Sequence, residues 1–275
     1  MKGPLIGRLA AHVVLWAFTI TALVPVYVMV SASLRTQDSF LNHPFALPLS
    51  PTLANFRTAL NDQFPRWLLN SVVLSGGSVL LTLIVAALAG WGFSRYRFPG
   101  RETLLNVIVA LMVVPPVVLV VPLFLLGVRL DLINTFRLVI VIYVGLMLPF
   151  SVYMLTAYFR TIPQAILDAA TVDGASELQV FRRIVLPLSM APLLTLLVVN
   201  LLWVWNELLI ALVFLQSDDS RTLMAGLTAF QNRYNLDIPV VMAGLSLATL
   251  PILLIYLFGQ RFFMRGLVAG AIKGE

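Results

Sequence analysis

Cysteine is absent from this chain of 275 residues, and charged residues make up only 11% of it. Without cysteine the chain forms neither a disulfide nor a thiolate metal site. A soluble domain carries about a quarter charged residues, whereas 60% of this chain is hydrophobic. One core cannot bury that much apolar surface, so the composition predicts an integral membrane protein.

Motifs for catalysis and for nucleic-acid binding are also missing. The sequence has no Gly-x-x-x-x-Gly-Lys-Ser/Thr loop and no recognisable nucleophile–base set, so ATP hydrolysis by a P-loop mechanism is excluded. The net charge of +6 comes from 18 basic and 12 acidic residues. The basic residues fall mainly in short connections between apolar runs, which is typical of topology signals at lipid headgroups. We expect contacts with membrane lipid and none with nucleic acid.

Six stretches are long and apolar enough to cross a membrane as helices, which takes about 20 residues each. They cover residues 9–31, 67–93, 104–127, 138–159, 188–215 and 240–263. The third contains Pro115, Pro116 and Pro122, so we expect it to kink or unwind, with the freed backbone groups facing protein or water. The sequence shows no internal repeat and no soluble domain. It therefore predicts one all-α transmembrane domain over residues 1–275.

The orientation follows from the lysines and arginines in the connections. Residues 1–8, 94–103, 160–187 and 261–275 hold 11 of them, and residues 32–66, 128–137 and 216–239 hold 7. The richer side faces the cytoplasm in membrane proteins. This places both termini in the cytoplasm and the first and last of the poorer segments outside.

The cytoplasmic connection 160–187 has a helical rather than a loop-like sequence. Pro163 suits a first helical position, and Gln164 to Asp173 predicts a short helix. Gly174 suits the left-handed conformation that ends such a helix, and residues 175–185 predict a second one. The product is a helical hairpin over residues 163–186, at the membrane surface.

Two roles are open for this hairpin. It can rest on lipid headgroups as an amphipathic element, or it can dock to another protein. The first helix is compatible with docking, since it carries small residues near one face, which allow another backbone to approach closely, but the residues alone do not decide between the two roles. The residues near that face are Ile166, Ala169, Ala170 and Asp173.

The segment resembles the "EAA" signature of permeases from binding-protein-dependent ABC importers. That signature has an acidic residue, two alanines, a glycine shortly after, and later an apolar residue with Leu-Pro. Its counterparts here are Asp168-Ala169-Ala170, Gly174 and Ile184-Val185-Leu186-Pro187. Asp168 stands where the family usually has glutamate, which shortens the reach of the carboxylate.

The resemblance extends over nearly the whole chain. Asn70-Ser71 is similar to the start of the family's second helix, and residues 95–101 are similar to its next cytoplasmic connection. Trp205-Asn206-Glu207 and the tail 260–274 resemble the carbohydrate-uptake branch.

Membership implies a type I importer of the bacterial or archaeal plasma membrane, with six transmembrane helices in each permease. It implies two different permease subunits, two cytoplasmic ATPase subunits that bind ATP and Mg²⁺, and an extracytoplasmic solute-binding protein. This chain itself then needs no cofactor and is not the enzyme. The solute implied is a sugar or a related compound. The residues implied to couple to the ATPase are Asp168, Ala169, Ala170, Asp173, Gly174 and Ala175.

Glu207 is the only acidic residue within a predicted span. Such residues usually face a bundle interior or a water-filled path. Glu207 and Asn206 therefore either line the translocation path or its gate, or join helices as a packing element near the outer interface. Trp203 either stacks on a sugar ring or anchors its helix at an interface.

The leading hypothesis is a permease subunit that forms half of a translocation path and is driven by a partner ATPase. The main alternative is a stand-alone secondary transporter or channel. Such proteins usually carry ion-coupling carboxylates near mid-membrane and paired broken helices, whereas this sequence offers one off-centre glutamate and no repeat. A membrane enzyme lacks an active-site cluster here, and a scaffold is the remaining alternative.

Overall fold

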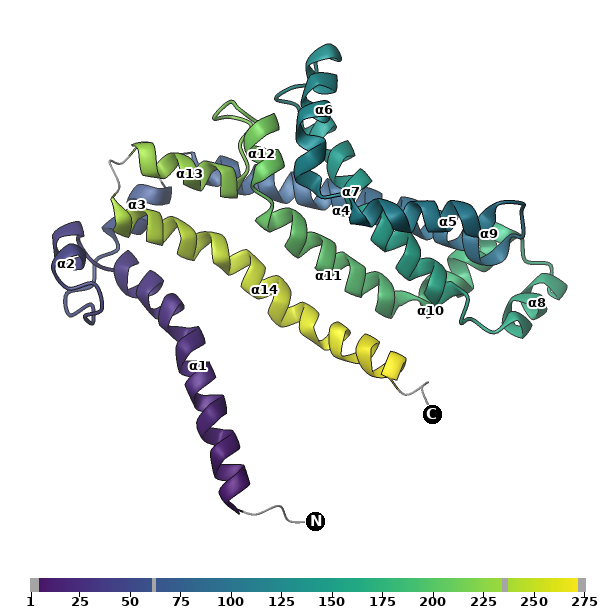
Figure 1. The fold of residues 1–275 in the computed structure, drawn as a ribbon, viewed down its shortest axis with the longest axis horizontal. Helices are drawn as coiled ribbons and strands as arrows, with labels where there is room; N and C mark the ends of the chain where they lie inside the picture. The colour runs from purple at the N-terminus through teal and green to yellow at the C-terminus, as the bar shows by residue number, and fades with distance from the viewer. Residues whose placement is uncertain (1–4, 61–62, 234–236, 272–275) are drawn as a thin grey trace. The chain divides into compact units, whose positions relative to one another are not determined.

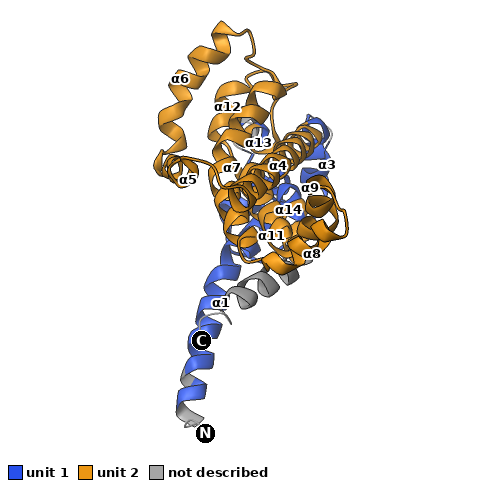
Figure 2. Cartoon of the chain, turned by 90° about the vertical axis from the view of Figure 1, so that its right-hand side faces the viewer, with its two compact units in different colours: residues 1–66, 226–250 blue, residues 67–225, 251–275 orange. Residues whose placement is uncertain are grey.

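The structure, a computed structural model, describes residues 5–60, 63–233 and 237–271 (Figure 1). Within those ranges all regular secondary structure is helical, which confirms the predicted fold class. The chain divides into two compact units (Figure 2), one of residues 1–66 with 226–250 and one of residues 67–225 with 251–275. The single domain expected from the sequence stays a prediction.

The first unit holds the amino-terminal helix and its surroundings. Its elements are α1 (Leu5–Ser33), α2 (Gln37–Asn42), α3 (Ala54–Leu60), most of α13 (Leu223–Arg233) and the first part of α14 (Ile238–Ala271). Helix α1 is exposed along residues 11–27, although that stretch is almost wholly apolar. Such a surface is stable only under a cover of lipid or another protein chain.

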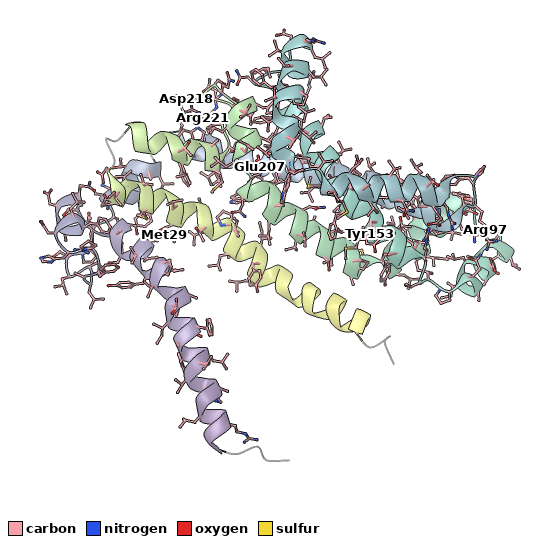
Figure 3. All side chains as sticks on the ribbon, in the orientation of Figure 1. Met29, Arg97, Tyr153, Glu207, Asp218 and Arg221 are labelled. Atoms are coloured by element: carbon pink, nitrogen blue, oxygen red, sulfur yellow. The ribbon has the colours of Figure 1, made fainter. Side chains whose placement is uncertain are left out.

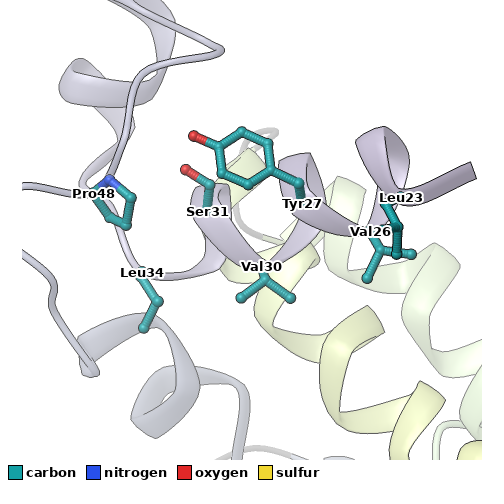
Figure 4. Close-up of a pocket in the computed structure, with 7 residues that line it drawn as sticks. All are labelled: Leu23, Val26, Tyr27, Val30, Ser31, Leu34 and Pro48. Atoms are coloured by element: carbon teal, nitrogen blue, oxygen red, sulfur yellow. The ribbon is translucent and has the colours of Figure 1, made fainter. Parts of the chain in front are cut away.

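The loop after α1 is organised by a buried arginine. The Arg35 side chain is 4% exposed and donates to the backbone carbonyl oxygens of Ser39, His43 and Ala46. A buried cation needs such partners, because burial without them is costly. An apolar hollow of about 310 Å³ lies beside this loop (Figure 4), lined by Leu23, Val26, Tyr27, Val30, Ser31, Leu34 and Pro48.

The second unit contains the helices that carry the candidate sites. They are α4 (Phe64–Arg95), α5 (Arg101–Ala110), the 3₁₀ turn η1 (Leu111–Val113), α6 (Pro116–Arg129), α7 (Phe136–Phe159), α8 (Gln164–Val172), α9 (Glu177–Val180), the π-helical turn η2 (Phe181–Val185), α10 (Leu186–Leu188), α11 (Met190–Asn206) and α12 (Leu209–Phe214). Helix α7 is central, since α5, α11 and α12 all pack against it. Helix α4 approaches α7 closely at Gly90, where a Cβ atom would lie 3.1 Å from the Leu155 Cβ atom and 3.2 Å from the Thr156 backbone nitrogen.

Four described helices are long and apolar enough to cross a membrane, and there are six spans if each of two bent pairs counts as one. The predicted spans 9–31, 67–93, 138–159 and 240–263 lie within α1, α4, α7 and α14. The predicted span 104–127 is broken as expected, with an angle of 98° between Arg101–Val113 and Pro116–Arg129. Pro115 is extended there and Pro116 starts the next helix, because proline has no N–H group to continue the first.

The predicted span 188–215 is not one continuous helix in the structure, where α11 covers Met190–Asn206 and α12 covers Leu209–Phe214. A bend of 73° separates Glu177–Leu188 from Met190–Asn206, and the Tyr158 hydroxyl donates to the Leu188 carbonyl oxygen at that bend over 2.9 Å. The helix stops again at Asn206, and α12 follows as a separate element. Neither proline nor glycine stands at 206–208, so this second break depends on tertiary contacts.

Candidate coupling hairpin and translocation path

The hairpin turns at Gly174 as the sequence predicts. Gly174 has a φ of +81°, a region that glycine adopts without strain. Its N–H donates to the Thr171 carbonyl oxygen over 3.1 Å, and the Ala175 N–H donates to the Ala170 carbonyl oxygen over 2.9 Å. These two bonds form the Schellman motif that closes the carboxyl end of α8.

Both helix starts in the hairpin differ from their predicted positions. Pro163 is the N-cap residue of α8 rather than its first helical residue. The second helix begins at Glu177 rather than at Ala175, because Ser176 caps it in a reciprocal pair of bonds with Gln179. The Ser-x-x-Gln spacing of this capping box is visible in the sequence. The end of the second helix also differs, since residues 181–185 form a π-helical turn.

The six predicted coupling residues divide between two faces. Ala170 and Ala175 are half-buried and pack against the unit's own apolar core. The other four are exposed: Asp168, Ala169, Asp173 and Gly174. Gln164 donates to the Asp168 carboxylate over 2.7 Å, one turn earlier on the same helix.

Large apolar side chains are also exposed on the hairpin, and of these the sequence analysis named only Ile166. Val172 is 87% exposed, Leu178 59% and Ile166 43%. Apolar side chains grouped on a surface mark contacts with protein or membrane.

Aromatic packing fixes the hairpin to the ends of α4 and α7. The Trp91 ring centroid lies 6.0 Å from that of Phe181 and 6.5 Å from that of Phe159. Arg95 adds an ion pair to Glu177, with 3.6 Å between nitrogen and oxygen. Sequence reasoning missed these anchors, and the only signal was a tryptophan four residues before Arg95.

Glu207 occupies the break between α11 and α12 (Figure 3). Its Oε1 atom accepts a hydrogen bond from the Ile210 N–H over 2.9 Å, and its Oε2 atom accepts one from the Ala211 N–H over 3.2 Å. The Tyr143 hydroxyl of α7 donates to Oε2 over 2.6 Å. The carboxylate thus supplies acceptors for two of the N–H groups that every helix start leaves without a helical partner.

Trp203 and Asn206 precede this break on α11. Asn206 is exposed and donates to the Leu202 carbonyl oxygen of its own helix over 2.7 Å. Trp203 packs edge-on against Tyr143, with ring centroids 5.7 Å apart and planes at 82°. It also lines a cavity of about 470 Å³ whose other lining residues come from residues 111–126 and from α7.

The loop after α12 is held from two sides by polar side chains. Asn70 of α4 donates to the carbonyl oxygens of Asp219 and Arg221 over 2.9 and 2.8 Å. The Asn134 amide oxygen accepts from the N–H groups of Gln216 and Ser217 over 2.5 and 3.1 Å. Asp218 and Arg221 form an ion pair in the same loop (Figure 3). In the sequence Asn70 stands out only as part of a motif. Its role in holding the loop follows from its contacts with residues about 150 positions later in the chain.

Residues 78–268 match the family described as binding-protein-dependent transport system inner membrane component. The chain belongs to this family. This permease is 39% identical to a putative ABC transporter permease protein from Caldicellulosiruptor sp., with 94% of each chain covered. It is 31% identical to the trehalose/maltose transport system permease protein MalG of Thermococcus litoralis, with both chains covered completely.

The fold agrees with that of a solved importer. A chain in the crystal structure of a bacterial ABC transporter involved in the import of the acidic polysaccharide alginate superposes with a TM-score of 0.82. The two are 21% identical, and 94% of this permease and 96% of that chain are covered. This likeness concerns the fold, and membership in the family makes the protein a multi-pass membrane permease of an ABC importer, in which ATP hydrolysis takes place on separate ATPase subunits.

The family match contains the hairpin and the break at Glu207. It begins after Asn70 and excludes α1 and the Arg35 loop. Among the described residues, no group of three or more His, Cys, Asp or Glu side chains is placed to hold a metal ion.

Proposed function

We propose that this permease forms half of a translocation pathway for a sugar or a closely related solute. The names of its relatives support the solute class, since one is a trehalose/maltose transport system permease. A second, different permease subunit supplies the other half. Two ATPase subunits hold ATP and Mg²⁺, and an extracytoplasmic binding protein delivers the solute.

The observation that carries this proposal is the construction of the hairpin. It presents Asp168, Ala169, Asp173 and Gly174 outward, while Ala170 and Ala175 fix it to the permease. Small exposed residues admit the backbone of a docking protein, and apolar neighbours supply area to bury. The ATPase therefore docks on the outward face, and the aromatic anchors pass its movement to α4 and α7.

The proposed topology places the hairpin and both termini in the cytoplasm. The loop after α12 and the Arg35 loop then face the binding protein. ATP binding closes the ATPase pair, which favours one orientation of the permease over the other by differential affinity. Trp203, Asn206 and Glu207 lie at or near the pathway.

Uptake measurements test the solute class. Cells that express the complete importer would be offered radiolabelled trehalose, maltose and alginate oligosaccharides, with an equal amount of a labelled amino acid as the control. We expect ATP-dependent accumulation of at least one carbohydrate, and a strain that lacks the ATPase subunits serves as the uncoupled reference. Accumulation of the amino acid alone would contradict the proposed solute class.

A further inference from the structure

We infer that Glu207 is a positioning residue, which holds Tyr143 and through it the Trp203 indole at the wall of the 470 Å³ cavity. The inference rests on the proposed function only in giving Trp203 a place on the translocation path. In this inference the Glu207 carboxylate binds groups of the protein itself and does not contact the solute.

The hydrogen bonds of the Glu207 carboxylate support this assignment. A carboxylate has about four acceptor positions, and three are taken by the N–H groups of Ile210 and Ala211 and by the Tyr143 hydroxyl. All three partners are hydrogen-bond donors, and an ionised carboxylate only accepts, so each of these bonds has a proper donor and acceptor. Few positions remain with which it could bind a solute hydroxyl.

The residue next to Glu207 explains why a carboxylate is needed there. Leu208 is the N-cap residue of α12 and makes no side-chain cap bond, because an alkyl side chain has no acceptor. Glu207, one residue earlier, reaches past it to the second and third residues of α12. Unpaired N–H groups in an apolar environment are expensive, so the break between α11 and α12 depends on this side chain.

Tyr143 carries the effect to the cavity. It is fully buried, and its ring is fixed at one end by the bond to Glu207 and along one edge by Trp203. Trp203 is 37% exposed and lines the cavity with Ile142, Gly145 and Leu146 of α7. Without the bond from Tyr143 to Glu207, no polar group among the described residues orients the phenol, and the indole that packs against it loses its fixed support.

A cysteine reporter in the cavity tests the inference without requiring a known solute. The chain has no cysteine of its own. Gly145 lines the cavity, and a Cβ atom added there would meet nothing within 4 Å, so Gly145→Cys is expected to fit. The probe is methanethiosulfonate ethylammonium, applied to membrane vesicles that contain the complete importer. The readout is the labelling rate of this chain, determined by mass spectrometry.

Three backgrounds would be compared with the reporter alone: Tyr143→Phe, Glu207→Gln and the double variant. Phenylalanine keeps the ring and removes the donor, while glutamine places an NH₂ donor among groups that are themselves donors. We expect each single change to raise the labelling rate on the order of tenfold, the scale on which a lost charge-assisted hydrogen bond shifts an equilibrium. The double variant should label no faster than the faster single variant, since both remove the same bond.

Tyr153→Phe is the matched control, because Tyr153 lies on the same helix and is 49% exposed. It should leave the rate unchanged. Additive effects of the two changes, or a Tyr143→Phe rate equal to that of the control, would overturn the inference. If Glu207→Gln prevents assembly, the labelling rates of Tyr143→Phe and Tyr153→Phe still test the inference.

A separate variant tests the pathway. Trp203→Ala would be assayed for uptake of trehalose and maltose. Normal uptake together with non-additive labelling would remove Trp203 from the path and leave the positioning role of Glu207 intact. Lost uptake with additive labelling would keep Trp203 on the path and contradict the positioning role of Glu207.

Discussion

The turn at Gly174 gives the sharpest test of the coupling hairpin. Its φ of +81° disfavours residues with a Cβ atom, although a Cβ there would meet no atom within 4 Å beyond Gly174 and its two chain neighbours. The cost of a substitution therefore comes from the local backbone conformation and not from a clash with the rest of the protein. An L-residue in the left-handed region costs about 1–2 kcal/mol, and a β-branched one is a genuine outlier there. Gly174→Val should thus lower the equilibrium constant for closing the hairpin by roughly 5- to 30-fold.

Asparagine provides the matched control at the same position, because its short polar side chain tolerates the left-handed region. We expect Gly174→Asn to bind the ATPase nearly as well as the parent, and Gly174→Val to lose most of it. The measurement is the amount of ATPase that co-purifies with each permease, normalised to permease in the membrane, followed by ATP turnover in reconstituted vesicles. Neither change touches a membrane span, so insertion should be equal.

Two results would refute this reasoning. If the valine variant couples normally, the turn is not required for docking. If both variants fail equally, the ATPase packs directly over the glycine, and side-chain volume rather than backbone conformation is what matters there.

Three further predictions concern the two faces of the hairpin, the loop after α12 and the topology. Ala169→Leu should weaken ATPase binding and leave the stability of the permease unchanged, whereas Ala170→Leu should lower the free energy of unfolding by about 1–3 kcal/mol because it overpacks the protein's own core. A thermal unfolding assay beside the ATPase co-purification distinguishes the two variants. Equal effects of both variants would contradict the assignment of Ala169 to the exposed face and Ala170 to the core. Asn70→Asp keeps the shape of the side chain and loses the two N–H donors that bind the loop after α12. In membrane vesicles, trypsin should therefore cut that loop faster in the variant than in the parent permease. A cysteine in place of Ser39 should react with an impermeant thiol reagent in intact cells, and labelling only after lysis would reverse the proposed orientation.

The elements that the sequence predicted correctly are those whose causes are local. Gly174 ends its helix because of its own backbone freedom, and the break at Pro115 and Pro116 follows from a missing N–H group. Apolar length alone located α1, α4, α7 and α14. The capping box at Ser176 is equally local, since the Ser-x-x-Gln spacing places the helix start at Glu177 and not at the preceding alanine.

The break at Glu207 could not be predicted in the same way. Its hydrogen-bond donor Tyr143 is 64 residues away in the chain, and no proline or glycine marks the position. A carboxylate in an apolar run indicates only that something polar lies opposite. The same limit applies to Asn70, whose partners Asp219 and Arg221 are identified only once α4 is seen beside that loop.

Helix α4 connects the candidate coupling hairpin with the loop after α12 inside one compact unit. It has 32 residues and is therefore about 48 Å long at 1.5 Å per residue. Asn70 near its start binds the loop after α12, and Trp91 near its end packs on Phe181.

Aromatic packing contributes more than the ion pair to holding the hairpin against the end of α4. The ion pair between Arg95 and Glu177 spans 3.6 Å, and the glutamate side chain is 48% exposed, so it contributes little. Trp91 and Phe181 are 6% and 5% exposed, and buried aromatic pairs contribute beyond their area. A displacement of the hairpin therefore has to move the end of α4 with it, because separating these rings would expose apolar surface. Since Gly90 sets α4 directly against α7 only one residue before Trp91, the same displacement reaches the helix that carries Tyr143.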